Sequence, residues 1–331
     1  MHNNMSRAWT VREYGEPDTA LRLEDVAAPA PGPGQIRVRV AATSCNFADV
    51  LLCRGEYQQK PPTPFTPGLE LCGWVDDIGI GVDVALLADR VVGQPTLPHG
   101  GFADYALMKA TDAYPVPEMI DDITAATLHL TYLTAWLGLH RRAALTAGKV
   151  VVVTAAAGGV GSAAVQIARA AGAFVIGIVS GAGKAATVDR LGADVVIDRS
   201  RVDVIEAVKS AAPGGADIVF ESVGGGSYEQ ATKYIGFEGH IVLVGFASGI
   251  IPQSRLNHAF VKNYTLDGLH WSLYCTKRPD LVRAAQRDIF DMAAAGLIDP
   301  LITSRVGLGD VPTALHNLAN GYTQGKTVIT V

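Results

Sequence analysis

Five side chains that could do chemistry fall within one otherwise apolar stretch: Cys45, Asn46, Asp49, Cys53 and Tyr57. Thiolates and carboxylates bind metal ions, a thiol beside a base acts as a nucleophile, and amides and phenols hydrogen-bond substrate oxygens. No histidine lies close to either cysteine in the sequence to lower a thiol pKa, and cysteines in such segments most often pack in the core. The nucleophile interpretation is therefore disfavoured, and metal binding and substrate binding remain open.

A glycine cluster follows the apolar run 150–154 and opens a helical pattern over 160–172. Ala156, Gly158 and Gly161 have the spacing of the dinucleotide-binding fingerprint, with alanine in place of the first glycine. Gly158 would let the backbone approach a pyrophosphate at the helix N-terminus, and Gly161 would allow helix and strand to pack closely. The sequence therefore predicts a cofactor-binding turn comprising Ala156, Gly158, Gly159, Val160 and Gly161.

The end of the next apolar run, 174–179, indicates which dinucleotide is bound. An NAD site places Asp or Glu there to hold the ribose 2′-hydroxyl, and this chain has Val179 followed by Ser180 and Gly181. No carboxylate is expected nearby to repel a 2′-phosphate, and Lys184 and Arg199 could supply positive charge. These residues predict NADPH as the cofactor.

The surrounding pattern predicts the elements that hold these residues. Up to about residue 125 the chain contains short β-rich pieces separated by turn residues, which predicts a compact barrel or sandwich. From about residue 149 apolar strands alternate with helical patterns, which predicts a doubly wound parallel sheet. The tail after Leu256 holds another strand candidate, 264–269, a helix at about 279–295 and a closing strand, 326–331, that could complete either domain.

Composition narrows the partners. The chain has 331 residues, a net charge of -5 and no run rich in lysine or arginine, so nothing attracts it to nucleic acid or anionic lipid. The uncharged run 150–168 is long enough to span a bilayer, but its glycines and polar residues indicate a strand, a turn and a helix. The four scattered cysteines and the lack of a signal-peptide pattern are typical of a cytoplasmic protein. We expect neither a nucleic-acid partner nor a membrane partner.

Motifs along nearly the whole chain carry a family resemblance: PGPGQIRVRV, NFADVLLCRGEY, PFTPGLELCGWV, GGFADYA, LTAW, AAAGGVG, ESVGG, VGFASG and GKTVI. Together they resemble the zinc-free medium-chain dehydrogenase/reductases, in their quinone oxidoreductase branch. The resemblance implies an α/β protein with a GroES-like β-rich catalytic domain, residues 1–125 and 266–331. It also implies a Rossmann NADPH-binding domain, residues 126–265, with the active cleft between the two.

The resemblance also bears on the metal question. Positions that hold catalytic zinc in related alcohol dehydrogenases align with Asn46, Leu69 and about Leu130, and none of these is a good zinc ligand. Cys45 is one residue out of register, and His129 is the nearest imidazole to the third position. We therefore expect no metal.

Further site residues are implied by the resemblance alone. It places Asn46 and Asp49 beside the nicotinamide and Tyr57 toward the substrate, although Asp49 could instead be a cap and Tyr57 a partly buried aromatic. It places Thr134 next to the nicotinamide and Lys326 near the cofactor phosphates. The other implied cofactor contacts are Ser222, Val223, Gly224, Phe246, Ala247 and Ser248.

The expected activity is zinc-independent hydride transfer from NADPH to a small-molecule quinone or other conjugated carbonyl (enone) compound. Two alternatives stay open: a 2-enoyl thioester reductase, with Tyr57 as proton donor, and an NADPH-binding protein without catalysis. The apolar run 240–246 is expected to be the last strand of the parallel sheet. An exposed edge there would favour a homodimer.

Overall fold

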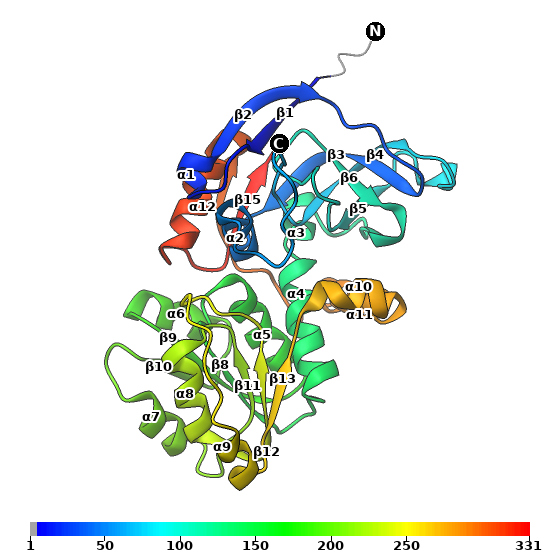
Figure 1. Ribbon diagram of the computed structural model, residues 1–331. Coiled ribbons are helices and arrows are strands. Elements are labelled where there is room, and N and C mark those ends of the chain that lie inside the picture. The colour runs from blue at the N-terminus through cyan, green and yellow to red at the C-terminus, as the bar shows by residue number, and fades with distance from the viewer. Residues whose placement is uncertain (1–4) are drawn as a thin grey trace. The chain divides into compact units, whose positions relative to one another are not determined.

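The computed structural model describes residues 5–331, which fold into two compact units (Figure 1). One unit contains the chain up to residue 130 together with 302–331, and the other contains 131–301. Residues 1–4, which the sequence analysis includes in the first domain, lie outside the described residues. Because the two termini of the chain meet in one unit, residues far apart in the sequence can build one site.

The first unit is built mainly of antiparallel strands, as its short β-rich pieces predict. Within the described residues it holds a sheet in the order β14-β15-β3-β4-β5-β7, with β6 paired to β3, and a separate pair, β1-β2. The strands are β1 Met5–Val11, β2 Leu21–Ala27, β3 Gln35–Ser44, β4 Leu71–Ile78, β5 Arg90–Gly93, β6 Tyr105–Lys109, β7 Ala113–Pro115, β14 Ile302–Gly307 and β15 Lys326–Thr330. The expected GroES-like β-rich domain is confirmed.

Strand β3 shows why these residues form a sheet around a core. Successive side chains of a strand face opposite sides, and Ile36, Val38 and Val40 all face inward and are buried. At its far end β3 pairs antiparallel with β15, and the Cys45 N–H donates to the carbonyl of Thr327 at 3.0 Å. The C-terminal strand is thereby held next to the start of α2.

The helices of this unit are short. They are α1 Pro17–Ala20, α2 Phe47–Arg54, α3 Asp122–Ala125 and α12 Val311–Ala319, with single turns η1 Val84–Leu86, η2 Ala110–Asp112 and η4 Leu308–Asp310. Helix α2 begins after its N-cap, Asn46, and ends at Gly55, whose φ of 68° is left-handed and favours glycine. Its buried side chains, Leu52 among them, pack in one core with Val311 and Leu315 of α12.

The second unit contains the expected doubly wound parallel sheet. Across residues 131–301, all of them described, six parallel strands run in the order β10-β9-β8-β11-β12-β13. They are β8 Val150–Val153, β9 Phe174–Val179, β10 Val195–Asp198, β11 Ala216–Glu221, β12 Ile235–Leu243 and β13 Thr265–Gly268. Their nearly continuous apolar runs are typical of strands buried on both faces.

Helices accompany this sheet, and Figure 1 shows α6, α7 and α8 beside it. The helical elements are α4 Leu130–Trp136, the π-helical turn η3 Leu137–Arg142, α5 Gly159–Ala170, α6 Ala182–Arg190, α7 Val204–Ala211, α8 Gly225–Tyr234, α9 Leu256–Lys262, α10 Trp271–Lys277 and α11 Pro279–Ala294. No helix among residues 5–331 is both long enough and apolar enough to cross a bilayer.

Two expectations about the sheet need correction. The domain limit expected at residue 265 falls inside this unit, because β13 adds to the sheet by pairing with β12 and brings residues 266–301 with it. For the same reason β12 is not the edge strand that the run 240–246 was expected to form. Strand β13 occupies that edge.

Candidate functional site

The turn between β8 and α5 lies at the carboxyl end of the parallel sheet, the edge where open α/β sheets bind ligands. Gly158 is the N-cap of α5, so the first backbone N–H groups of the helix lie at this edge without partners inside the helix. A Cβ built at Gly161 would lie 2.3 Å from the Ala155 carbonyl oxygen, which leaves no room for any side chain. Helix α5 therefore packs closely at Gly161, against the turn that follows β8.

The alanine at the first fingerprint position also has a structural explanation. The left-handed residue of the turn is Ala155, with φ of 47°, and the buried Ala156 follows it and donates its N–H to the Ile178 carbonyl at 3.0 Å. A Cβ built at Gly177 on the neighbouring strand would lie 3.2 Å from the Ala156 Cβ. Gly177 therefore leaves room for the Val188 side chain, which such a Cβ would approach to 2.5 Å, and also for the alanine methyl.

At the end of β9 a carboxylate lies where the sequence predicts none. Asp198 pairs with Val179 across β9 and β10, and its carboxylate accepts the Gly181 N–H at 2.8 Å. It also accepts the Ser200 hydroxyl at 2.6 Å and the Ser200 N–H at 3.0 Å. The Ser200 hydroxyl, together with these backbone donors, holds the pKa of Asp198 below its usual range. The expectation that no carboxylate lies near this strand end was wrong, since Asp198 approaches it through strand pairing.

The residues expected to bind the 2′-phosphate lie around this strand end. Ser180 and Arg199 are exposed, and the Arg199 N–H donates to the Val179 carbonyl at 2.9 Å. Gly181 has φ of 95°, and a Cβ built there would meet no atom within 4 Å. Lys184 lies in the first turn of α6, half-buried. The site is thus open, with Lys184 and Arg199 beside one carboxylate, Asp198, which also pairs with the exposed Arg201 at 3.6 Å.

The two loops expected to contact the cofactor also contact one another. The Ala247 N–H donates to the Ser222 carbonyl at 3.0 Å, and the Ser248 N–H donates to the Val223 carbonyl at 2.9 Å. Phe246 lies against Gly224, where a built Cβ would come 3.0 Å from its ring. The segments 222–224 and 246–248 therefore form one surface at the carboxyl end of β11 and β12.

A buried carboxylate that the sequence analysis did not select supports this surface. Glu221 accepts the N–H groups of Val223 at 2.7 Å and Gly224 at 2.9 Å, and the Ser227 hydroxyl at 2.8 Å. Burial raises the pKa of Glu221, and these donors oppose the shift. On the other side Thr154 links the loop to β8, because its hydroxyl oxygen accepts the Ser222 N–H at 3.0 Å.

In the first unit the candidate residues surround a second buried carboxylate, Glu70. One of its oxygens accepts hydrogen bonds from the Ser44 hydroxyl, from Asn46 Nδ2 at 2.9 Å and from Lys326 Nζ at 2.7 Å. Its other oxygen accepts the Leu130 N–H at 2.9 Å. Burial alone would raise the pKa of Glu70, and the charge and hydrogen bonds of Lys326, with those of Ser44 and Asn46, lower it below its ordinary value.

The amide of Asn46 is fully committed inside the unit. Its Nδ2 donates to the Ser44 carbonyl at 3.2 Å as well as to Glu70, and its Oδ1 accepts from Lys326 Nζ at 2.6 Å. The residue is 5% exposed. Because both N–H donors are used, Asn46 holds the start of α2 in place and presents no free donor outward in this arrangement.

Asp49 is fully buried and bonded to the backbone. Its carboxylate accepts the N–H groups of Asn46 at 2.9 Å, Gly68 at 3.0 Å and Leu69 at 3.1 Å. Burial raises its pKa to about 7, against the effect of these donors and of the Lys326 charge. These contacts are those of a helix cap, the alternative role that the sequence allows for Asp49. The carboxylate also ties the loop before β4 to the N-terminus of α2.

The remaining candidates are also largely buried. Tyr57 is 9% exposed, and burial, followed by the Asp49 charge, raises its pKa to about 12. Thr134 lies in α4 and is 6% exposed. Cys45 and Cys53 are buried free thiols whose pKa values burial raises well above the ordinary value, which agrees with a packing role.

The expectation for Lys326 needs correction. Its side chain is 3% exposed, and its ammonium donates to the Cys45 carbonyl at 3.0 Å, to Asn46 and to Glu70. An ammonium group has three donors, so all of them are used inside the first unit. We therefore do not retain Lys326 as a ligand of the cofactor phosphates.

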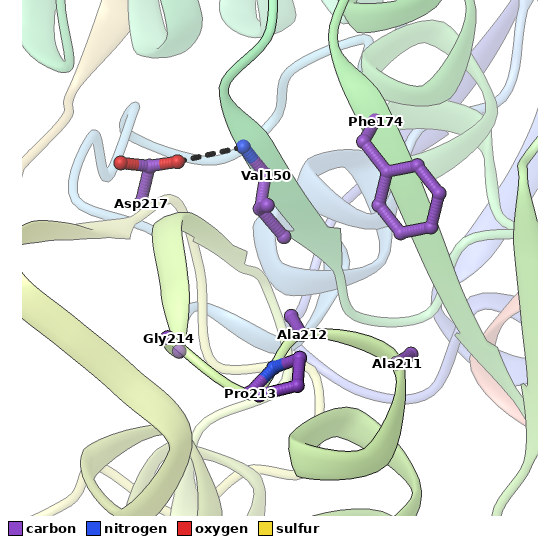
Figure 2. Close-up of a pocket in the computed structure, with 8 residues that line it drawn as sticks. Val150, Phe174, Ala211, Ala212, Pro213, Gly214 and Asp217 are labelled. Atoms are coloured by element: carbon purple, nitrogen blue, oxygen red, sulfur yellow. Dashed lines mark hydrogen bonds between the residues drawn. The ribbon is translucent and has the colours of Figure 1, made fainter.

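In the described part of the chain, neither a metal-binding cluster nor the hollow at the other edge of the sheet adds a site. No group of three or more His, Cys, Asp or Glu side chains that could hold a metal ion occurs among residues 5–331. A shallow hollow lined by Phe174, Pro213 and Asp217 lies at the amino ends of β8 and β9 (Figure 2). There Asp217 accepts the Val150 N–H at 2.8 Å and pairs with Lys149. This edge is opposite the one where such sheets bind ligands, and we assign no cofactor to it.

Sequence reasoning missed the carboxylates Glu70, Asp198 and Glu221, although the sequence holds a faint signal for Glu70 and Glu221. Glu70 and Glu221 each adjoin an apolar strand segment, and both are fully buried. An ionised side chain is rarely fully buried unless it is paired or hydrogen-bonded, so its presence in such a segment indicates a polar partner. The partner itself, such as Lys326, could not be identified from the sequence.

Comparison with known proteins agrees with this architecture. Residues 32–118 match the family model of the alcohol dehydrogenase GroES-like domain, and residues 159–286 match that of the zinc-binding dehydrogenases. The quinone oxidoreductase of Escherichia coli, solved in complex with NADPH, superimposes with a TM-score of 0.91 at 27% identity, covering 98% of this chain and 100% of that one. The quinone oxidoreductase of Pseudomonas syringae gives a TM-score of 0.92 at 28% identity, covering 99% and 100%.

A curated relative is closer in sequence. The chain is 38% identical to the quinone oxidoreductase-like protein 2 homolog of Nematostella vectensis over 298 residues, which is 89% of this chain and 81% of the relative. The resemblance read from the motifs is thus confirmed over most of the chain. The chain belongs to the quinone oxidoreductase-like family of medium-chain dehydrogenase/reductases.

Proposed function

We propose that this chain is an NADPH-dependent reductase that transfers hydride to a quinone or another electron-poor conjugated carbonyl compound. The observation that carries the proposal is the turn before α5, where Gly161 packs against Ala155 without space for a side chain and leaves the helix N-terminus at the ligand-binding edge. The related quinone oxidoreductase of Escherichia coli was solved with NADPH bound, which supports the choice of cofactor.

The residues of the second unit fit the cofactor by their chemistry. Backbone N–H groups suit a pyrophosphate, and Lys184 and Arg199 suit a 2′-phosphate. When bound, NADPH supplies the hydride. The residues that would hold it are Ala156, Gly158, Gly159, Val160, Gly161, Ser180, Gly181, Lys184, Arg199, Ser222, Val223, Gly224, Phe246, Ala247 and Ser248.

For the substrate we propose Tyr57 as the hydrogen-bond donor. Asn46 and Asp49 have their polar atoms committed to neighbours, whereas no residue between 5 and 331 hydrogen-bonds the Tyr57 hydroxyl. A pKa of about 12 keeps the phenol protonated at neutral pH, so it can donate to a carbonyl oxygen on which charge develops. Thr134 is retained as a candidate contact to the nicotinamide.

We also propose that the reaction needs no zinc, because Asn46, Leu69 and Leu130 offer no ligand set of the kind that catalytic zinc requires. Chelator should leave activity intact, and protein purified without added metal should hold no stoichiometric zinc. One tightly bound zinc ion per chain, lost together with activity, would contradict this part of the proposal.

A homodimer is the assembly we propose. Strand β13 leaves one edge of the sheet open, and exposed apolar side chains lie on α9 close by in sequence: Leu256, Phe260 and Val261, each more than 70% exposed. Open edges and apolar patches of this kind favour pairing of identical chains. A monomeric mass by light scattering at micromolar concentration would exclude the dimer.

The experiment that tests the activity measures NADPH oxidation against a panel of quinones, enones and enoyl-CoA esters. We expect turnover with quinones or enones. Preference for enoyl thioesters would assign the chain to the alternative reductase. Tight NADPH binding without oxidation by any acceptor would replace the proposal with a binding role.

A further inference from the structure

The buried ion pair between Lys326 and Glu70 joins segments that are far apart in the chain. Lys326 lies 256 positions from Glu70 and 280 positions from Asn46, with Nζ distances of 2.7 Å and 2.6 Å. The side chains of the pair are 3% and 0% exposed. Burying two charges is costly, and a hydrophobic pair of similar size would often give equal or greater stability. Stability alone therefore does not explain why this buried pair is present.

The pair fixes the orientation of one side chain in particular. Lys326 can only donate, so it requires the carbonyl oxygen of the Asn46 amide, and Glu70 requires the NH₂ group. A flipped amide would set its NH₂ group against the Lys326 ammonium and its oxygen against the Glu70 carboxylate. Asn46 is thus held in a single orientation by two opposite charges.

Asn46 in turn begins the helix that carries the proposed substrate donor. It is the N-cap of α2, and its backbone N–H is bonded to Asp49 in the first turn. At the other end of this eight-residue helix the Tyr57 N–H donates to the Leu51 carbonyl at 3.2 Å. A displacement at the first turn would therefore move Tyr57.

We propose that Lys326 is a positioning residue for the reductase reaction: by holding Asn46 and Glu70 it fixes α2, and through α2 it sets the place of the Tyr57 hydroxyl. This inference rests on the proposed function, in which Tyr57 donates to the substrate. Lys326 itself touches neither substrate nor cofactor in this role.

The test separates positioning from stability by using a double variant. Lys326→Met or Glu70→Gln alone leaves one buried group without its partner and should lower stability strongly, whereas the double variant removes the uncompensated charge and should recover most of it. We expect the double variant to bind NADPH within about twofold of wild type and to show kcat reduced at least about tenfold, because small misplacements of reacting groups cost this much or more. A stable double variant with wild-type kcat would overturn the inference.

A charge-preserving variant keeps the test informative if the double variant fails to fold. Lys326→Arg retains the positive charge, but a planar guanidinium cannot match the same three acceptors, so we expect a folded protein with reduced kcat. Full kcat in this variant would overturn the inference. The matched control is Lys149→Met with Asp217→Asn, a partly exposed pair of the second unit that should leave kcat unchanged. A wild-type protein that oxidises no NADPH with any acceptor would instead refute the proposed function.

Discussion

The two units differ in how they hold charge. In the first unit Glu70, Asp49 and Lys326 are almost completely buried and are bonded to one another or to backbone groups. At the ligand-binding edge of the second unit Arg199 is exposed and Lys184 half-buried, around a turn whose polar groups belong mostly to the backbone. Buried charges with every partner in place fix geometry, whereas accessible charges can still meet a ligand. We infer that the first unit orients and the second binds.

The largest effect is expected at Tyr57, the substrate donor that we propose for the first unit. Removing its hydroxyl by Tyr57→Phe should reduce kcat by about a hundredfold or more, the usual effect of losing one donor to a developing oxyanion. NADPH affinity should not change, because the cofactor residues lie in the second unit. Steady-state kinetics together with cofactor titration measure both quantities.

Tyr14→Phe is the matched control, since that hydroxyl donates to the Pro61 carbonyl at 2.9 Å and has no proposed role in the reaction. It should keep wild-type kcat. If Tyr57→Phe retained full kcat, Tyr57 would be one more packed aromatic and the first unit would lack its proposed donor.

The binding role of the second unit depends on the glycine turn. Gly161→Ala would place a Cβ 2.3 Å from the Ala155 oxygen, and we expect it to cost about 1 to 3 kcal/mol in stability as overpacking does, with loss of NADPH affinity. Gly226→Ala is the control, because it lies in helix α8 and its Cβ would meet nothing within 4 Å. Thermal unfolding and cofactor titration should separate the two variants. Equal behaviour would show that the turn tolerates a side chain.

Lys184→Ala and Arg199→Ala test whether these two accessible cations bind the 2′-phosphate of the cofactor. Each should weaken NADPH binding by roughly ten- to a hundredfold, since a hydrogen bond to a charged group is typically worth about 1.5 to 3 kcal/mol. NADH binding should stay unchanged in both. Lys149→Ala, at the opposite edge of the sheet, is the control. Equal loss for both cofactors, or a wild-type preference for NADH, would contradict the assignment of the 2′-phosphate site.

These two regions also differ in how far the sequence predicts them. The glycine turn was predicted because Ala156, Gly158 and Gly161 lie within one strand–turn–helix unit, and the packing of Gly161 on Ala155 is local. The parallel sheet followed from apolar runs of regular spacing. The role of Lys326 could not be predicted, because its acceptors lie more than 250 positions away and no periodic pattern connects them.

The raised pKa of the buried carboxylate Asp49 in the first unit predicts how the stability of the protein depends on pH. Its pKa is raised to about 7 in the folded protein, from an ordinary value near 3.8, so the folded state binds more protons than the unfolded state between these values. Its contribution to stability is therefore greatest at low pH and falls as pH rises toward 7, by at most about 1.4 kcal/mol per pH unit. Asp49→Asn cannot ionise and should flatten this part of the stability profile. Denaturant unfolding between pH 4.5 and about 7.5 measures the slope, and an unchanged slope in the variant would assign it to another group.

The smallest expected effect concerns Asp198, the carboxylate that strand pairing brings beside Gly181 at the cofactor edge. Its negative charge opposes a 2′-phosphate there, while its bonds to Gly181 and Ser200 hold the turn. Asp198→Asn keeps one acceptor oxygen and removes the charge, so the turn should persist and the ratio of NADPH to NADH affinity should rise, by about two- to fivefold as for partly exposed charge interactions. The gain should shrink at high salt, because screening weakens the repulsion that the substitution removes. Titration of both cofactors at low and high ionic strength checks this. A fall in affinity for both cofactors alike would mean that Asp198 acts only by shaping the turn.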